Sequence, residues 1–82
     1  MKKMVSISEA LGKTIARERR NRGLSQEEFA WMIGSDQKYL SDVELGKRNV
    51  SLLFAKRVAD GFGFSISELF ELIEKERHFM IK

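Results

Sequence analysis

The sequence contains no cysteine and no proline, and its 82 residues include only one histidine, one tryptophan and one tyrosine. Without cysteine the chain has no disulfide and no thiolate metal site, although the redox compartment is left open. The single histidine, His78, leaves too few acid–base or zinc-binding groups for an active site. We therefore expect no enzymatic activity, no cofactor and no metal.

Long apolar runs are missing as well. No segment approaches the roughly 20 apolar residues that span a membrane, and residues 1–13 lack the apolar stretch of a signal peptide. We expect a cytoplasmic protein with no membrane partner. Hydrophobic residues make up 43% of the chain, so it is expected to fold as one domain whose modest core is supplemented by dimerisation.

Apolar residues recur at helical spacing, and no segment alternates as a strand does. Five helices are therefore predicted, which makes the fold all-α. The expected N-terminal caps are Ser6, Ser25, Asp36, Ser51 and Ser65. The predicted helices cover residues 6–21, 25–33, 37–45, 52–60 and a segment from 66 onward, and residues 61–63 are expected to end the fourth. Ile7 and Leu52 are among the side chains expected to face inward.

Residues 25–46 are the most informative stretch. They are predicted to form two short amphipathic helices joined by a tight turn at Gly34, with the small Ala30 where the helices approach closely. This layout is typical of a helix-turn-helix, in which the outward side of the second helix reads DNA.

Charge is distributed unevenly along the chain. Residues 1–24 hold seven Lys or Arg against two Glu, whereas residues 25–46 hold one Lys against five acidic residues, a sum of −4. If the chain binds DNA, most of the attraction to phosphates must come from the segments that flank the motif.

Over residues 11–70 the chain resembles the Cro/phage-repressor family of helix-turn-helix regulators, also called the xenobiotic-response-element type. The matching segments are 24–30, Gly34, 39–41, 44–49, 51–52, Ala59, 62–63, Ser65 and 68–70. The resemblance implies a compact five-helix, lambda-repressor-like domain with the helix-turn-helix at helices 2 and 3. Residues 1–82 are expected to form one such domain, with a core at about 7–70 and dimerisation through 66–82. Stand-alone phage repressors and restriction–modification controller proteins match equally well.

The resemblance, together with the chemistry of the side chains, indicates a set of DNA contacts. Base-reading residues are expected at the exposed side of the third helix: Gln37, Lys38, Ser41 and Asp42. Phosphate-binding residues are expected at the start of the second helix, on the third helix and in the loop after it: Ser25, Gln26, Tyr39, Lys47, Arg48 and Asn49. Two alternatives stay open, since Asp42 can instead orient Lys38, and the Tyr39 ring can pack against the second helix.

Other residues are expected to hold the domain or its dimer together. By resemblance, Arg19 and Glu44 form a buried ion pair that orients the third helix. Trp31 is expected to pack within the domain. Apolar residues beyond the needs of the core are assigned to a two-fold dimer interface: Leu53, Phe54, Phe70, Ile73, Phe79, Met80 and Ile81.

The sequence therefore predicts a homodimeric, sequence-specific regulator of transcription that binds double-stranded operator DNA. Repression or control of its own operon is the expected outcome, and RNA polymerase is a further candidate partner. An alternative of another class is an antitoxin-like module whose apolar tail at 79–81 binds a partner protein. The oligomeric state in solution distinguishes the two.

Overall fold

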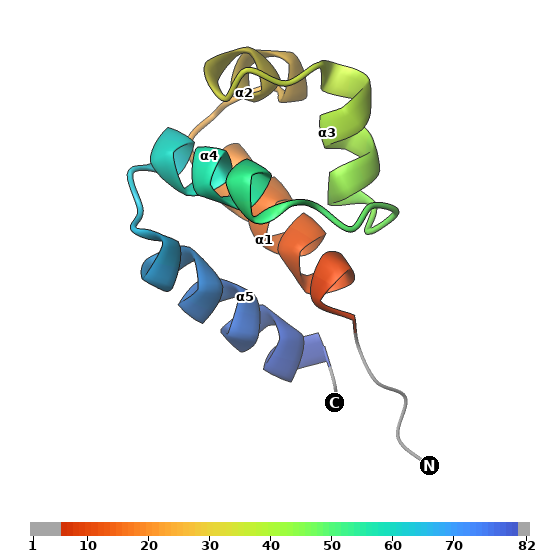
Figure 1. Cartoon of the computed structure of the whole chain (residues 1–82), viewed down its shortest axis with the longest axis vertical. Coiled ribbons are helices and arrows are strands. Elements are labelled where there is room, and N and C mark those ends of the chain that lie inside the picture. The colour runs from red at the N-terminus through yellow and green to blue at the C-terminus, as the bar shows by residue number, and fades with distance from the viewer. Residues whose placement is uncertain (1–5, 81–82) are drawn as a thin grey trace.

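The computed structural model describes residues 6–80, and five helices account for most of them, with no strand in that range. The helices are α1 (Ile7–Asn21), α2 (Gln26–Met32), α3 (Gln37–Glu44), α4 (Leu52–Phe62) and α5 (Ile66–Met80). Figure 1 shows α2 and α3 together at one end, α5 at the other, and α1 and α4 between them. The all-α prediction is confirmed, and none of these helices is long and apolar enough to cross a membrane.

The predicted caps are also confirmed. The side chains of Ser6, Ser25, Asp36 and Ser51 each accept a backbone N–H at the start of the helix that follows. The Ser65 hydroxyl likewise accepts the Glu68 N–H at 3.0 Å. Each bond satisfies a helix-terminal donor that would otherwise lack a partner, so the short polar residues fix where the helices begin.

The core joins α2 to α4 through two stacked aromatic rings. The rings of Phe29 and Phe62 lie 4.3 Å apart between centroids with 12° between their planes. Ile15, Leu40 and Leu69 bring side chains from α1, α3 and α5 into the same buried cluster. The two helices of the motif are therefore anchored on the rest of the domain rather than packed only on each other.

The fourth helix ends within residues 61–63, as expected, but two residues later than the predicted end at residue 60. Gly61 lies inside α4, which continues to Phe62 and ends at Gly63 in the left-handed conformation, with φ of 77°. A Cβ at Gly61 would lie 2.7 Å from Ile33 Cγ2 and 3.0 Å from the Phe29 ring. Residue 61 is a glycine because α2 packs closely against it. The positive φ that favours glycine occurs at Gly63.

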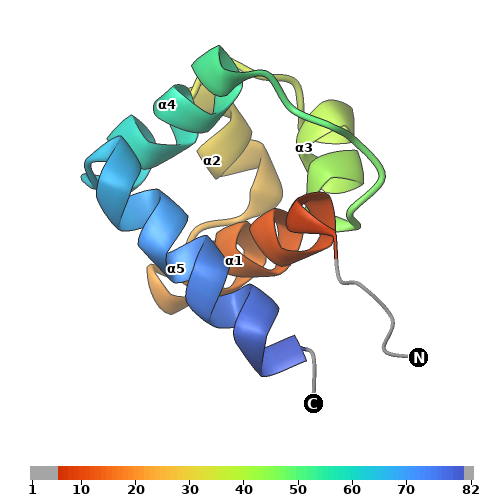
Figure 2. The same cartoon turned by 60° about the horizontal axis from the view of Figure 1, so that its bottom comes forward.

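Two residues expected to face inward are exposed instead. Ile7 and Leu52 are 56% and 70% exposed to solvent, because each is the first residue of its helix and lies at the margin of the core. Both line a shallow hollow together with Val50 and Phe70. This apolar margin spans α1, α4 and α5, and α1 and α5 lie side by side in Figure 2.

Candidate nucleic-acid interface

The turn between α2 and α3 is closed by backbone hydrogen bonds. The Ser35 N–H donates to the Ala30 carbonyl at 2.8 Å, and the Gly34 N–H donates to the Trp31 carbonyl at 3.2 Å. Gly34 has φ of 71°, a conformation in which a side chain is strained. The predicted turn at Gly34 is thus confirmed, and it sets the angle at which α3 leaves α2.

A buried ion pair ties α1 to the end of α3, as predicted. Arg19 donates through Nε and Nη2 to the two carboxylate oxygens of Glu44, at 2.8 and 3.0 Å, and through Nη1 to the Leu24 carbonyl at 2.8 Å. The Glu44 carboxylate also accepts from Gln26 Nε2 at 2.9 Å. One carboxylate therefore joins α1, the start of α2 and the last residue of α3.

Hydrogen bonding to Glu44 raises the pKa of Arg19 above its ordinary value, and the negative charge of Glu44 adds to this while burial opposes it. The guanidinium accordingly stays charged. Since both partners are almost buried, with side chains 10% and 5% exposed, their mutual bonds replace the water that each has lost. The pair fixes the position of α3 rather than adding charge to a surface.

Close packing between α1 and α3 reinforces this link. A Cβ at Gly12 would lie 2.4 Å from the Val43 carbonyl oxygen and 2.6 Å from that of Glu44. Gly12 is thus the residue that lets the backbones of the two helices meet, and the sequence analysis had not identified it.

The first turn of α3 presents polar side chains to the solvent. Gln37 and Lys38 are exposed, and Ser41 is half-buried one turn later. The Asp36 carboxylate accepts the Tyr39 N–H at 2.7 Å, so it acts as the cap. The amide and ammonium groups of this turn have the donor and acceptor patterns that read base edges in a major groove.

Asp42 pairs with Arg48 in the loop after α3, so the suggested pairing with Lys38 was wrong. Arg48 Nη2 lies 3.2 Å from Asp42 Oδ2. The guanidinium also lies over the Tyr39 ring, 5.6 Å from its centroid. The Tyr39 ring packs edge-on against Phe54 of α4, with centroids 5.1 Å apart. The loop is thus held to the exposed side of α3.

The remaining candidate phosphate ligands lie in the loop after α3 and at the start of α2. Lys47 and Asn49 are exposed, and the Asn49 side-chain oxygen accepts from the Ser8 hydroxyl at 2.7 Å. Ser25 is engaged as the cap of α2. The Gln26 side-chain amide has two N–H donors. One donates to Glu44, and the other is left for a phosphate.

Arg22, one of the basic residues counted in the flank, has a structural role instead. It donates to the Phe62 carbonyl at 2.9 Å and pairs with Glu18 at 2.7 Å. Its guanidinium lies 4.7 Å from the Phe62 ring centroid and 5.3 Å from that of Phe64. Arg22 therefore secures the end of α4, and the charge count alone could not reveal this.

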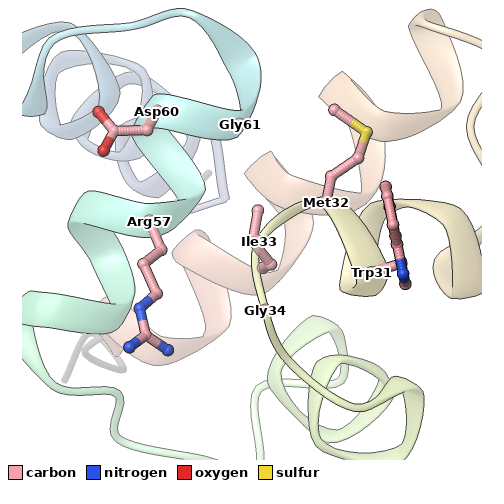
Figure 3. Close-up of a pocket in the computed structure, with 7 residues that line it drawn as sticks. All are labelled: Trp31, Met32, Ile33, Gly34, Arg57, Asp60 and Gly61. Atoms are coloured by element: carbon pink, nitrogen blue, oxygen red, sulfur yellow. The ribbon is translucent and has the colours of Figure 1, made fainter.

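The structure corrects the positions of three apolar residues. Trp31 does not pack within the domain, since it is 83% exposed, and it stands beside a hollow of about 590 Å³ between the end of α2 and α4 (Figure 3). Phe54 and Ile73, assigned to a dimer interface, are 7% and 4% exposed and belong to the core. Leu53, Phe70 and Phe79 from the same set are exposed, Met80 is partly buried, and Ile81 lies outside the described residues.

A family model described as helix-turn-helix matches residues 15–69, more than half of the chain. The chain belongs to the helix-turn-helix family of transcriptional regulators. Its five helices and the exposed first turn of α3 agree with that assignment, and the predicted resemblance is confirmed.

Within this family the chain is similar to a control protein and to two restriction–modification controller proteins. It is 53% identical over 53 residues to control protein C.MunI of a Mycoplasma species, and the aligned segment covers 65% of this chain and 72% of the relative. The restriction–modification controller protein C.AhdI of Aeromonas hydrophila is 36% identical, with a TM-score of 0.72 over 77% of this chain and 96% of that one. The controller protein C.Esp1396I, solved as a tetramer with its natural 35-base-pair operator, is 25% identical, with a TM-score of 0.80 over 89% of this chain and 96% of that one.

Proposed function

We propose that this chain binds a double-stranded operator as a homodimer and regulates transcription there, by repression or by control of its own operon. The observation that carries the proposal is the exposed first turn of α3, held in place by the network of Arg19, Glu44 and Gln26. The operator complex of C.Esp1396I supports the same use of this fold. On this proposal the protein acts in the cytoplasm, without a cofactor, and meets RNA polymerase at the promoter.

The proposed contacts divide into two groups. Gln37 and Lys38 read bases from the exposed first turn of α3, which would enter the major groove, and Ser41 reads bases from the next turn. Phosphates are bound by the basic and polar groups around α3 (Ser25 and Gln26 at the start of α2, Tyr39, and the loop residues Lys47, Arg48 and Asn49). Asp42 positions Arg48 through their ion pair. Asp42 can therefore read a base only if this ion pair opens.

Substitutions in the two groups are expected to give different binding profiles. Gln37→Ala or Lys38→Ala should cost about 1–3 kcal/mol on the operator and relax the preference at one base position. Arg48→Ala should instead weaken binding to every sequence alike. The negative slope of log K against log salt should become shallower by about 0.9, the value for one lost phosphate contact. Fluorescence anisotropy against single-base operator variants at several salt concentrations measures both effects. If all three variants weaken every duplex equally, this division of roles is wrong.

The proposed dimer interface is the exposed apolar margin of α4 and α5. Leu52 and Leu53 keep 70% and 64% of their surface and line a hollow of about 390 Å³ with Ile66. Phe70, 46% exposed, extends this apolar surface onto α5, whereas Phe79, 65% exposed, lines a separate hollow with Lys13 and Arg20. A two-fold dimer built on this margin would place two recognition helices about 34 Å apart, which suits a palindromic operator.

Leu53→Asp is expected to convert the dimer to a monomer, since a carboxylate would have to be buried at the two-fold interface. The fold should persist because Leu53 is exposed within one chain. Size-exclusion chromatography with light scattering gives the mass, and circular dichroism gives the helix content. Leu45→Asp is the matched control, because Leu45 is also 64% exposed but follows α3, and this variant should stay dimeric. A monomeric wild type would contradict the proposal and favour a partner protein on this surface.

A further inference from the structure

A basic face of α1 lies outside the set of DNA contacts discussed so far. Lys13, Arg17 and Arg20 are spaced four and three residues apart, so they project from the same side of the helix. They line one hollow of about 400 Å³ together with Glu44, Glu76 and Phe79. We call the exposed cations of this hollow, Lys13 and Arg20, the α1 basic pair.

The hollow carries net positive charge because its carboxylates already have partners. Glu44 is bound by Arg19, and Glu76 is bound by Arg17. Lys13 and Arg20 are exposed, and neither makes an ion pair within residues 6–80. Lys75 of α5 adds a third cation in the adjoining hollow. These charges have no structural role comparable to those of Arg17, Arg19 and Arg22.

The basic hollow is continuous with the proposed DNA interface. Glu44 is the last residue of α3 and also lines the hollow. The same carboxylate accepts from Gln26, a proposed phosphate ligand at the start of α2. A duplex that lies along α3 and the start of α2 therefore reaches the margin where the α1 basic pair begins.

We propose that the α1 basic pair binds backbone phosphates of DNA that flanks each half-site, beyond the bases that α3 reads. This inference rests on the proposed function. Its physical reason is the charge distribution: residues 25–46 sum to −4, so the motif itself repels phosphates. Each phosphate neutralised by a lysine or arginine releases counterions and makes binding tighter and more dependent on salt. The α1 basic pair supplies this attraction without adding sequence preference.

Two operator duplexes of different length test the proposal. The short duplex ends at the outer edges of the half-sites, and the long one carries about one further helical turn of unrelated sequence on each side. The wild-type protein should bind the long duplex more tightly, with a slope of log K against log salt that is steeper by about 0.9 for each added phosphate contact. The double variant Lys13→Gln/Arg20→Gln should lose this gain, on the order of 10-fold in affinity at low salt, while it binds the short duplex as the wild type does.

Arg57→Gln is the matched control, since Arg57 is an exposed cation on α4 beside the hollow at Trp31. It should retain the full gain from the longer duplex. The proposal is overturned if the wild type gains nothing from the flanks, or if the double variant weakens both duplexes equally. Loss of the proposed function itself has a separate signature, because the wild type would then bind operator and scrambled duplexes of the same length with equal affinity.

Discussion

Replacing Glu44 with alanine is expected to lower the free energy of unfolding by about 3–5 kcal/mol, the usual cost of removing one partner from a buried ion pair. Arg19 would remain in a nearly closed site, bonded to the Leu24 carbonyl but without its carboxylate, and Gln26 would lose Glu44 as an acceptor as well. Urea denaturation followed by circular dichroism measures the loss. The same variant should weaken operator binding, because the end of α3 is no longer held to α1.

An exposed ion pair provides the control for this change. Lys56 and Asp60 lie 2.6 Å apart on α4 with side chains 53% and 61% exposed, so Asp60→Ala should cost less than about 1 kcal/mol. A Glu44→Ala variant that is no less stable than Asp60→Ala would show that the pair does not hold the domain together.

Gly12→Ala is expected to destabilise the domain by about 1–3 kcal/mol, the usual range for overpacking a tightly packed contact. Alanine is normally favoured over glycine inside a helix by about 0.5–1 kcal/mol. A loss of stability on Gly12→Ala would therefore indicate the close approach of α1 and α3 rather than helix propensity. The new Cβ would meet the Val43 and Glu44 carbonyl oxygens at 2.4 and 2.6 Å. Because these are backbone atoms, α1 and α3 would have to separate, and the melting temperature and operator affinity should fall together.

Gly61→Ala is the natural comparison, since Gly61 is also inside a helix and closely approached. Its nearest neighbours are side-chain atoms of Ile33 and Phe29, at 2.7 and 3.0 Å, which can shift where backbone cannot. We expect a smaller loss than for Gly12→Ala. A Gly12→Ala protein as stable as the wild type, with unchanged DNA affinity, would contradict the close approach of α1 and α3.

Local sequence signals predicted the elements of the fold. Short polar caps such as Ser25 and Asp36 fixed the helix starts, because each satisfies backbone donors within three residues. Gly34 marked the turn for the same local reason. The Arg19–Glu44 pair was found only through the family resemblance, since its partners are 25 residues apart.

Features set by packing between distant segments were missed or wrong. Phe54 was placed on the outer side of its helix, but the Tyr39 ring and the core enclose it. Nothing near Gly12 in the sequence indicates that α3 will touch it. The Asp42–Arg48 pair depends on how the loop after α3 folds back, and helical spacing carries no information about that. The site was therefore predicted as a set of residues, whereas their mutual contacts required the structure.

The central claim is that the exposed turn of α3 selects a DNA sequence while basic residues around it supply affinity. Selection from a pool of random duplexes with the full chain, followed by anisotropy on enriched and scrambled sequences, tests this most directly. The account predicts enrichment of a two-fold symmetric sequence with half-sites one helical turn apart, bound about 10³-fold or more tightly than scrambled DNA. Failure to enrich any sequence, with equal affinity for all duplexes at each salt concentration, would contradict it.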